Sequence, residues 1–176
     1  MKRDYIDFQD RSMPLAYFIS FRCYGTWLHG DSRGSVDRRH FNRHGAPKFP
    51  VRPKMVVREK VNAKQEPVSL DRRQRRLVES SIKQVCSHRG YGLIAVNVRS
   101  NHAHSVVSAA SRPEPILTAF KAYATRHLRE SGLIGPKAKV WSRHGSTRYL
   151  WTPEQIEAAA DYVLYCQGDD FLDIRW

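Results

Sequence analysis

Residues 91–109, YGLIAVNVRSNHAHSVVSA, decide the fold. Two β-prone runs meet at Ser100-Asn101, where a tight turn is expected, so the stretch predicts two strands joined as a hairpin. His102 and His104 lie two positions apart in the second strand, and alternation therefore points both imidazoles to one face. The opposite face carries Ala103, Ser105 and Val107. Because these side chains are small and mostly apolar, that face is expected to meet helices.

A helix is expected on each side of this hairpin, because apolar residues recur there at helical spacing. The first lies between Asp71 and His88, with Gly90 as a stop. The second runs from about residue 114 to 130, and Gly132 follows its end. Each helix therefore has an apolar face that can pack on a sheet.

Two outer stretches, PLAYFISFRCY (14–24) and VWSRHGSTRYLW (140–151), are β-prone and predict two more strands. The TPEQ stretch at 152–155 then begins a third helix. Its threonine can cap the helix, its proline suits the first turn and its glutamine completes a capping box. This helix carries Tyr162 and is expected to end at Gly168.

The order of these elements is strand, loop, helix, strand, strand, helix, strand, helix. It matches an α+β fold of ferredoxin-like (RRM-like) type, an antiparallel sheet with two helices on one face. The third helix, which bears the tyrosine, is expected on the other face, where the histidines point. Residues 1–176 are expected to form one domain with a basic loop excursion at about 29–66, where ten Lys or Arg stand against four Asp or Glu.

The net charge of +13, with a pI near 10.1, points to a polyanionic partner. Nucleic acid is the first candidate, and a merely solvated basic surface is the alternative. No apolar run is long enough to span a bilayer, so no membrane partner is expected. The three cysteines, Cys23, Cys86 and Cys166, are far apart and form no C-x-x-C, which indicates reduced thiols in a cytoplasmic protein.

The pair His102 and His104 is a candidate clamp for a divalent metal that lacks one or two further ligands. Because the chain has eight histidines, such a pair also arises by chance, and two ordinary hydrogen-bonded histidines are the alternative. Tyr162 is the candidate nucleophile, since a metal could draw charge from a phosphodiester and make it a better electrophile. The alternative for Tyr162 is a side chain that only flanks the packed face of its helix.

Two motifs resemble those of a known family. RSNHAHSVV (99–107) resembles the HUH metal motif of single-tyrosine transposases, in which two histidines flank a hydrophobic residue. DYVLYCQ (161–167) resembles the tyrosine helix of the REP-associated tyrosine transposases, and 16–38 resembles the first strand and loop of that group. The matching segments occur in the family's order and span most of the chain.

The resemblance implies Mg²⁺ or Mn²⁺ held by His102 and His104, with Tyr162 as the nucleophile. The product would be a 5′-phosphotyrosine and a free 3′-hydroxyl. The implied substrates are single-stranded DNAs with imperfect hairpins, such as repetitive extragenic palindromes or element ends. A monomer and a homodimer that exchanges its tyrosines are both open.

The third metal ligand departs from the family pattern. Family members commonly place an amide residue four positions after the tyrosine, whereas here Cys166 stands fourth and Gln167 fifth. Positions five apart lie roughly 140° apart around an ideal helix. Gln167 is therefore expected to reach the metal only if the helix loosens just before Gly168.

Contacts to DNA are expected from basic and aromatic side chains around this centre. The basic candidates for the DNA backbone are Arg99, Lys121, Arg126, Arg143 and Arg148, and the candidates for base stacking are Trp141, Tyr149 and Trp151. The alternatives are ordinary surface charge for the former and core packing for the latter.

Two other functions fit parts of this pattern. A non-catalytic nucleic-acid-binding module with an RRM-like sheet would share the fold and the charge, but no aromatic-rich RNP-type strand is present. A relaxase or replication initiator would share the metal motif, but such proteins are generally longer and often place the tyrosine upstream.

Overall fold

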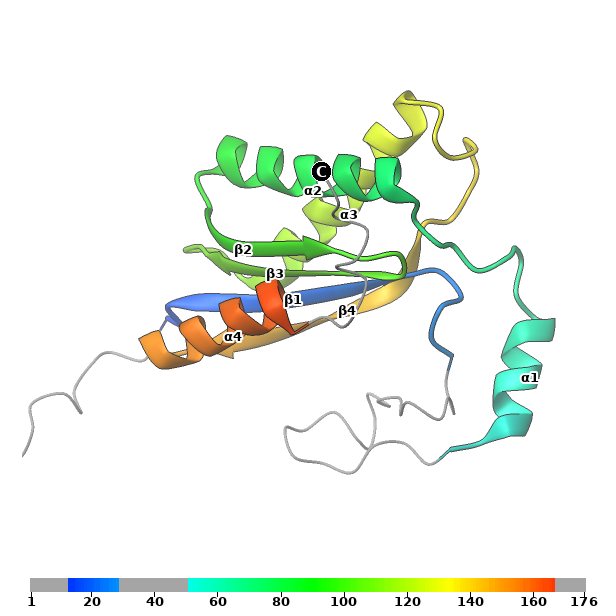
Figure 1. Ribbon diagram of the computed structural model, residues 1–176, viewed down its shortest axis with the longest axis horizontal. Helices are drawn as coiled ribbons and strands as arrows, with labels where there is room; N and C mark the ends of the chain where they lie inside the picture. The colour runs from blue at the N-terminus through cyan, green and yellow to red at the C-terminus, as the bar shows by residue number, and fades with distance from the viewer. Residues whose placement is uncertain (1–12, 29–50, 167–176) are drawn as a thin grey trace, which may run out of the picture.

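The computed structural model describes residues 13–28 and 51–166. Four strands form one antiparallel sheet in the order β2-β3-β1-β4 (Figure 1). The strands are β1 (Ala16–Cys23), β2 (Gly92–Val98), β3 (His102–Ser108) and β4 (Trp141–Leu150). The helices are α1 (Pro53–Val61), α2 (Arg72–Arg89), α3 (Pro113–Glu130) and α4 (Pro153–Tyr165). Leaving α1 aside, the element order and the strand order are those of a ferredoxin-like fold, which confirms the predicted fold class.

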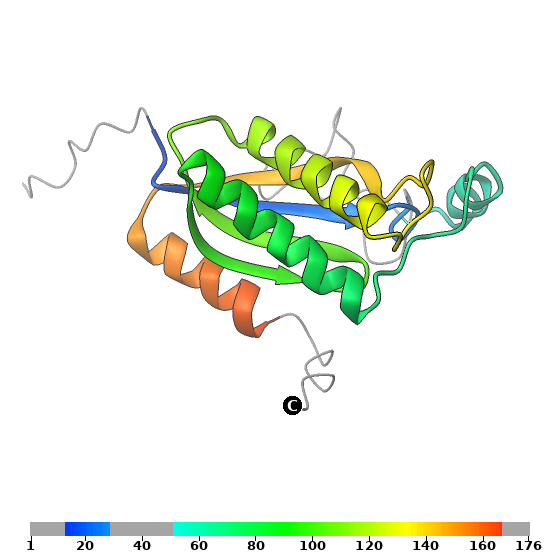
Figure 2. The ribbon, with the colours of Figure 1, turned by 90° about the horizontal axis from the view of Figure 1, so that it is seen from above.

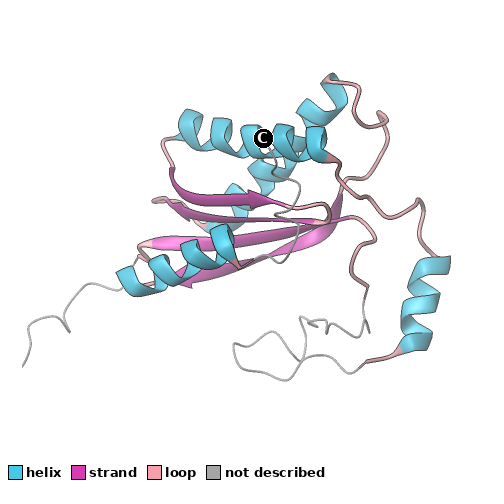
Figure 3. Cartoon of the chain, viewed as in Figure 1, coloured by secondary structure: helices cyan, strands magenta, loops and turns pink. Residues whose placement is uncertain are grey.

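The helices cover both faces of the sheet. Figures 1 and 2 show α2 and α3 side by side on one face and α4 on the other. The main core lies between the sheet and α2 and α3, with Phe21, Ile82 and Phe120 among its largest buried side chains. A second, smaller cluster lies under α4 and includes Val106 and Val163. The sheet is therefore packed on both sides, as the three-layer view in Figure 3 also shows.

Local sequence explains the ends of α2. The Asp71 side chain accepts a hydrogen bond from the backbone N–H of Gln74 at 2.8 Å, and the Gln74 side chain accepts one from the Asp71 N–H at 2.9 Å. This reciprocal capping box satisfies two backbone donors that the helix itself leaves unpaired. At the other end Gly90 has φ 67°, the left-handed conformation that favours glycine.

The predicted turn at Ser100-Asn101 is confirmed and sets the register of the central hairpin. The backbone N–H of Arg99 donates to the carbonyl of His102 at 2.8 Å and closes a two-residue loop. In the resulting ladder Asn97 pairs with His104 on one side, and Ser20 of β1 pairs with it on the other. The same face of the sheet therefore carries one residue from each of three strands in a row.

Two details differ from the sequence prediction. The stretch 29–66 is not without regular structure, because Pro53–Val61 forms α1, a helix with no buried residue. It lies away from the sheet in Figure 1 and therefore needs no apolar face. Its sequence consequently lacks the apolar periodicity that would have predicted a helix. Residues 29–50 lie outside the described residues.

The second difference from the sequence prediction concerns the two ends of α4. The Thr152 side chain accepts from the Gln155 N–H at 3.3 Å as predicted, but the Gln155 side chain accepts from the N–H of Trp151 rather than from that of Thr152. The helix ends at Tyr165, with Cys166 as its C-cap, earlier than the expected stop at Gly168.

None of the helices in the described parts of the chain is long and apolar enough to cross a membrane. All three cysteines are free thiols, as predicted, with Cys23 and Cys86 buried and Cys166 exposed. Burial raises the pKa of the Cys23 thiol to about 12, so this thiol stays protonated near neutral pH.

Candidate active site

Helix α4 lies across the face of the sheet that carries the histidines, as the sequence predicted. Val163 is fully buried against Val106 and Leu150, with Ile156 and Ala159 packed at the edge of this cluster. Burying a valine or leucine side chain stabilises a protein by roughly 1.5–3 kcal/mol, so these contacts hold the helix to the sheet.

Tyr162 sits next to this packed seam. Its side chain is 45% exposed, so it borders the packed seam instead of filling it. A buried tyrosine would have indicated a packing role only, whereas this phenol remains accessible.

Three aromatic rings gather around His104. The Tyr162 ring lies 5.8 Å from the His104 ring, centroid to centroid, and the His102 ring lies 4.6 Å from it. Phe18 of β1 stacks on His104 at 5.3 Å with an interplanar angle of 17°, and it meets the Tyr162 ring edge-on at 6.0 Å. Residues from β1, β3 and α4 therefore meet at one place, although up to 144 positions separate them along the chain.

Each histidine has a polar partner at its Nδ1 atom. The Nδ1 of His104 lies 2.6 Å from the hydroxyl oxygen of Ser20. The Nδ1 of His102 makes a short hydrogen bond with the side-chain oxygen of Asn101. Both imidazoles are thus held through the same nitrogen by residues of neighbouring backbone segments.

His104 is held in its neutral form. Burial lowers its pKa from 6.5 to about 3, and the nearby charges of His102 and Arg22 act in the same direction. A neutral imidazole has a lone pair available for a metal ion, which a protonated one has not. The electrostatics of the site therefore suit a ligand histidine at any pH near neutrality.

The described residues offer an incomplete ligand set. Within 13–28 and 51–166, no group of three or more His, Cys, Asp or Glu side chains is placed to hold a metal ion. His102 and His104 can supply two nitrogens, which leaves other positions for oxygens of water, phosphate or an amide.

The predicted third ligand, Gln167, lies outside the described residues. The chain before it leaves the helix, because Cys166 is the C-cap, with its N–H donating to the Tyr162 carbonyl at 3.2 Å. Helix α4 thus ends at Tyr165, and Gln167 as the third ligand stays a prediction.

Three of the predicted DNA contacts share one groove on the opposite side of the sheet. Lys121 and Arg126 of α3 and Arg143 of β4 line a cavity of about 740 Å³ between these two elements. Lys121 is engaged within the protein, since its ammonium group donates to the carbonyls of Ser142 and His144 at 2.8 and 2.9 Å. Its burial lowers its pKa to about 8.

The other two basic candidates lie elsewhere. Arg148 is exposed and is the register partner of Phe18, so its side chain belongs to the face of Tyr162. Arg99 is only 6% exposed, next to the turn before His102, so its burial fits a structural role better than a phosphate contact. The five residues therefore do not form one continuous surface.

The aromatic candidates divide in the same way. Trp141 is buried, and its indole N–H donates to the Thr125 hydroxyl and to the Lys121 carbonyl. Trp141 therefore has the core-packing role that was the alternative to base stacking. Tyr149 and Trp151 are exposed and stack on each other at 6.1 Å.

Besides Asn101, four polar or aromatic residues of this site were not predicted from the sequence. Phe18, Ser20 and Arg22 are alternate residues of β1, and all three share the histidine face because they pair with β3 and β4 residues of that face. Asn97 of β2 completes the row beside His104. The sequence showed that these β1 residues alternate, but it did not show which strands lie beside β1.

Fold and site together define an α+β domain with a histidine pair and a tyrosine on one face of its sheet. No family model matches the chain, and no curated protein matches it. Solved structures do match. One is a REP-associated tyrosine transposase bound to a REP hairpin, with 12% identity and a TM-score of 0.49 over 93% of this chain and 68% of that one.

Another is a candidate transposase from Deinococcus radiodurans R1, with 11% identity and a TM-score of 0.45 over 93% of this chain and 95% of that one. Both identities are too low for residue roles to carry over to this chain.

Proposed function

We propose that this protein is a metal-dependent single-stranded-DNA endonuclease and transposase that cleaves and rejoins hairpin-containing DNA through Tyr162. The observation that supports this most is the meeting of His102, His104 and Tyr162 at one accessible place on the sheet. The resemblance of the sequence motifs supplies the substrate class.

Tyr162 is the nucleophile of this proposal. Its phenolic oxygen attacks the phosphorus of a phosphodiester and forms a new P–O bond, while the bond from phosphorus to the 3′-oxygen breaks. The phenolic proton goes to solvent, and the departing 3′-oxygen takes up a proton to become a 3′-hydroxyl. The resulting 5′-phosphotyrosine keeps the energy of the broken bond, so a second 3′-hydroxyl can reverse the step without a nucleotide cofactor.

His102 and His104 are the residues that would hold a divalent cation, Mg²⁺ or Mn²⁺. When bound, such a cation draws charge from the phosphate oxygens. The role of the protein is to present His104 as a neutral imidazole, which the partial burial of its ring favours. Gln167 remains the proposed third ligand.

The structure favours a site within one chain. Tyr162 lies 5.8 Å from His104 of the same chain, with Phe18 bridging the two rings. We therefore propose that the tyrosine serves its own histidine pair, which requires no partner subunit.

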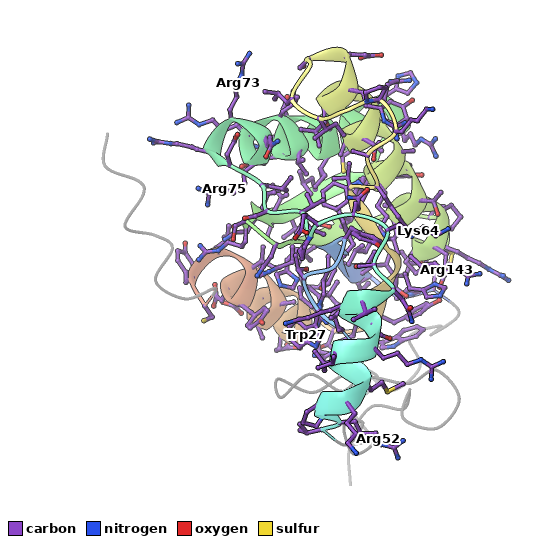
Figure 4. The ribbon with its side chains drawn as sticks, turned by 90° about the vertical axis from the view of Figure 1, so that its right-hand side faces the viewer. Trp27, Arg52, Lys64, Arg73, Arg75 and Arg143 are labelled. Carbon is purple, nitrogen blue, oxygen red and sulfur yellow. The ribbon has the colours of Figure 1, made fainter. Side chains whose placement is uncertain are left out.

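The DNA backbone is proposed to contact the exposed basic residues Arg126, Arg143 and Arg148, with Lys121 in the groove between α3 and β4. Arg99 is left out of this set because it is buried. Figure 4 shows further basic side chains on one side of the molecule, including Arg52, Arg73 and Arg75, which extends the positive charge beyond the site.

The position of α4 disfavours the alternative of an RRM-like binding module. In such a module bases stack on aromatic side chains of an open sheet. Here Phe18, the aromatic residue on that face of β1, packs against His104 and Tyr162, and α4 covers the neighbouring apolar residues.

The test is adduct formation on single-stranded hairpin DNA with Mg²⁺ or Mn²⁺. A DNA labelled at its 3′ end is expected to give an SDS-resistant protein adduct, whereas a 5′ label is expected on the released fragment. Tyr162→Phe abolishes the adduct but keeps the ring contacts. Tyr165→Phe is the matched control, because Tyr165 is an exposed tyrosine on the same helix.

His102→Ala is expected to abolish the adduct while DNA binding remains. An adduct that persists in Tyr162→Phe shows that another residue is the nucleophile. Binding of many hairpins without any adduct supports the non-catalytic module instead.

A further inference from the structure

The two candidate ligand histidines are held in the same way by residues that are not themselves candidate ligands. The hydroxyl oxygen of Ser20 lies 2.6 Å from Nδ1 of His104. The side-chain oxygen of Asn101 is hydrogen-bonded to Nδ1 of His102. These contacts come from different elements, since Ser20 belongs to β1 and Asn101 to the turn between β2 and β3.

The contact with Asn101 favours one tautomer of His102. An amide oxygen can only accept a hydrogen bond, so Nδ1 of His102 carries the proton. The backbone keeps Asn101 in place, because its carbonyl accepts from the N–H of Cys23 at 2.8 Å and from the Thr26 hydroxyl at 3.3 Å. In a neutral imidazole protonated at Nδ1, the lone pair that can bind a cation is on Nε2.

The contact with Ser20 can likewise keep the proton of His104 on Nδ1. A serine hydroxyl can donate or accept, and these two arrangements have opposite consequences for His104. If Ser20 accepts, Nδ1 carries the proton and Nε2 can bind a cation. If Ser20 donates, Nε2 carries the proton and His104 cannot bind a cation through that atom.

We propose that Ser20 and Asn101 are positioning residues that keep His104 and His102 as Nδ1–H tautomers and thereby present Nε2 of both imidazoles to a divalent cation. The inference rests on the proposed function, in which these histidines hold the cation. Partners of this kind fix the ring orientation of a ligand histidine, and their loss commonly lowers metal affinity about 10–100-fold.

The register of the sheet provides a matched control. Ser146 of β4 pairs with Ser20 on the side away from His104, and it is an exposed serine on the same face. Ser146→Ala therefore removes a hydroxyl from the same row without touching either imidazole. Ser20→Thr keeps the hydroxyl on a residue that suits a strand.

The first measurement is the tautomer in the protein without metal. Side-chain ¹⁵N NMR of histidine-labelled protein at pH 8 is expected to show both His102 and His104 protonated at Nδ1. Ser20→Ala is expected to shift His104 toward a mixture of tautomers, and Ser146→Ala is expected to leave it unchanged. Finding His104 protonated at Nε2 in the wild-type protein overturns the inference without affecting the nucleophile.

The second measurement is Mn²⁺ binding, followed by the EPR signal of the free ion during titration with the full chain. Ser20→Ala and Asn101→Ala are each expected to weaken binding about 10-fold or more. Three control variants keep a hydrogen-bond acceptor at both Nδ1 atoms and should bind Mn²⁺ with an affinity no weaker than that of wild type. They are Ser20→Thr, Asn101→Asp and Ser146→Ala.

The outcomes separate this inference from the proposed function. If His104→Ala abolishes Mn²⁺ binding but Ser20→Ala and Asn101→Ala bind like wild type, the inference is wrong and the metal site stands. If the wild-type protein and His104→Ala bind Mn²⁺ equally, the histidine pair is not the metal site, and the proposed function fails together with the inference.

Discussion

The side-chain amide of Asn97 donates a hydrogen bond to the backbone carbonyl of Val163 at 2.9 Å and thereby ties strand β2 to helix α4. The last four carbonyls of a helix have no partner within it, and Val163 is one of them because α4 ends at Tyr165. Asn97 is also the register partner of His104. The same row of the sheet therefore holds the histidine and the helix that carries Tyr162.

Removing this donor is expected to loosen the end of α4. Asn97→Asp keeps the size of the side chain but has no N–H to donate, so the Val163 carbonyl loses its partner. We expect the free energy of unfolding to fall by about 1–3 kcal/mol and the adduct yield to fall with it. Hydrogen exchange is expected to accelerate in α4 but not in α2.

Asn62→Asp is the control for this change. Asn62 is an exposed residue at the end of α1, so the same substitution there alters the charge without touching the site. Unchanged exchange of α4 in Asn97→Asp would show that the amide contact does not hold the helix.

Local patterns predicted most of this fold, because its elements are marked by caps, glycines and alternation. The helix that starts after Asp71 and its stop at Gly90 both proved correct. Helix α1 was missed because a helix without buried residues shows no apolar period.

Side-chain partners across the sheet were beyond prediction for a different reason. Ser20 and His104 are 84 positions apart, and their contact depends on strand order and register. A one-residue change of register would have placed Ser20 on the other face. The burial of Arg99 was missed likewise, since composition alone places an arginine at the surface.

Arg148 and Arg99 are expected to respond differently to loss of charge. Arg148→Gln removes an exposed charge on the Tyr162 face. The plot of log K for single-stranded DNA against log salt concentration should therefore become less steep, by about 0.7 in the magnitude of its slope. Arg99→Gln should instead lower the free energy of unfolding, because Arg99 is buried.

The slopes for wild type and Arg148→Gln are measured by DNA-binding titrations at salt concentrations between about 50 and 200 mM, where the effect of salt on affinity is large. Arg76→Gln is the control for a surface arginine on the other face, because Arg76 is an exposed residue of α2. Equal slopes for Arg148→Gln and wild type would remove Arg148 from the proposed DNA contacts.

Lys121 is expected to titrate close to pH 8, since burial lowers its pKa from 10.5. Between about pH 8 and 10.5 the folded protein then binds fewer protons here than the unfolded chain does. The free energy of unfolding should therefore rise with pH through this window. Lys121→Met removes this contribution, whereas Lys83→Met, at an exposed lysine, keeps it.

The measurement is urea unfolding from pH 7.5 to 10.5 for all three proteins, together with NMR of the lysine side chains. A Lys121 amine that titrates near 10.5 would contradict the burial seen beside Ser142 and His144.

The pH dependence below neutrality is expected to come partly from His104. Its pKa is about 3 in the folded protein, well below the ordinary 6.5 of an unfolded chain, chiefly because the imidazole is buried. Protons therefore bind the unfolded chain first as the pH falls below 6.5. The contribution of His104 to stability is complete above pH 6.5 and is lost progressively as the pH falls toward 3, with a slope of at most about 1.4 kcal/mol per pH unit.

Urea unfolding of wild type and His104→Gln between pH 7.5 and 5 tests this, because the carboxylates change little in this window. The difference in unfolding free energy between the two proteins should shrink as the pH falls, since wild type alone loses the His104 contribution. His88→Gln, at an exposed histidine of α2, should follow wild type throughout. A difference that is constant with pH would mean that His104 is protonated as easily in the folded protein as in the unfolded chain, and a neutral ligand at that position would then need the metal itself to displace the proton.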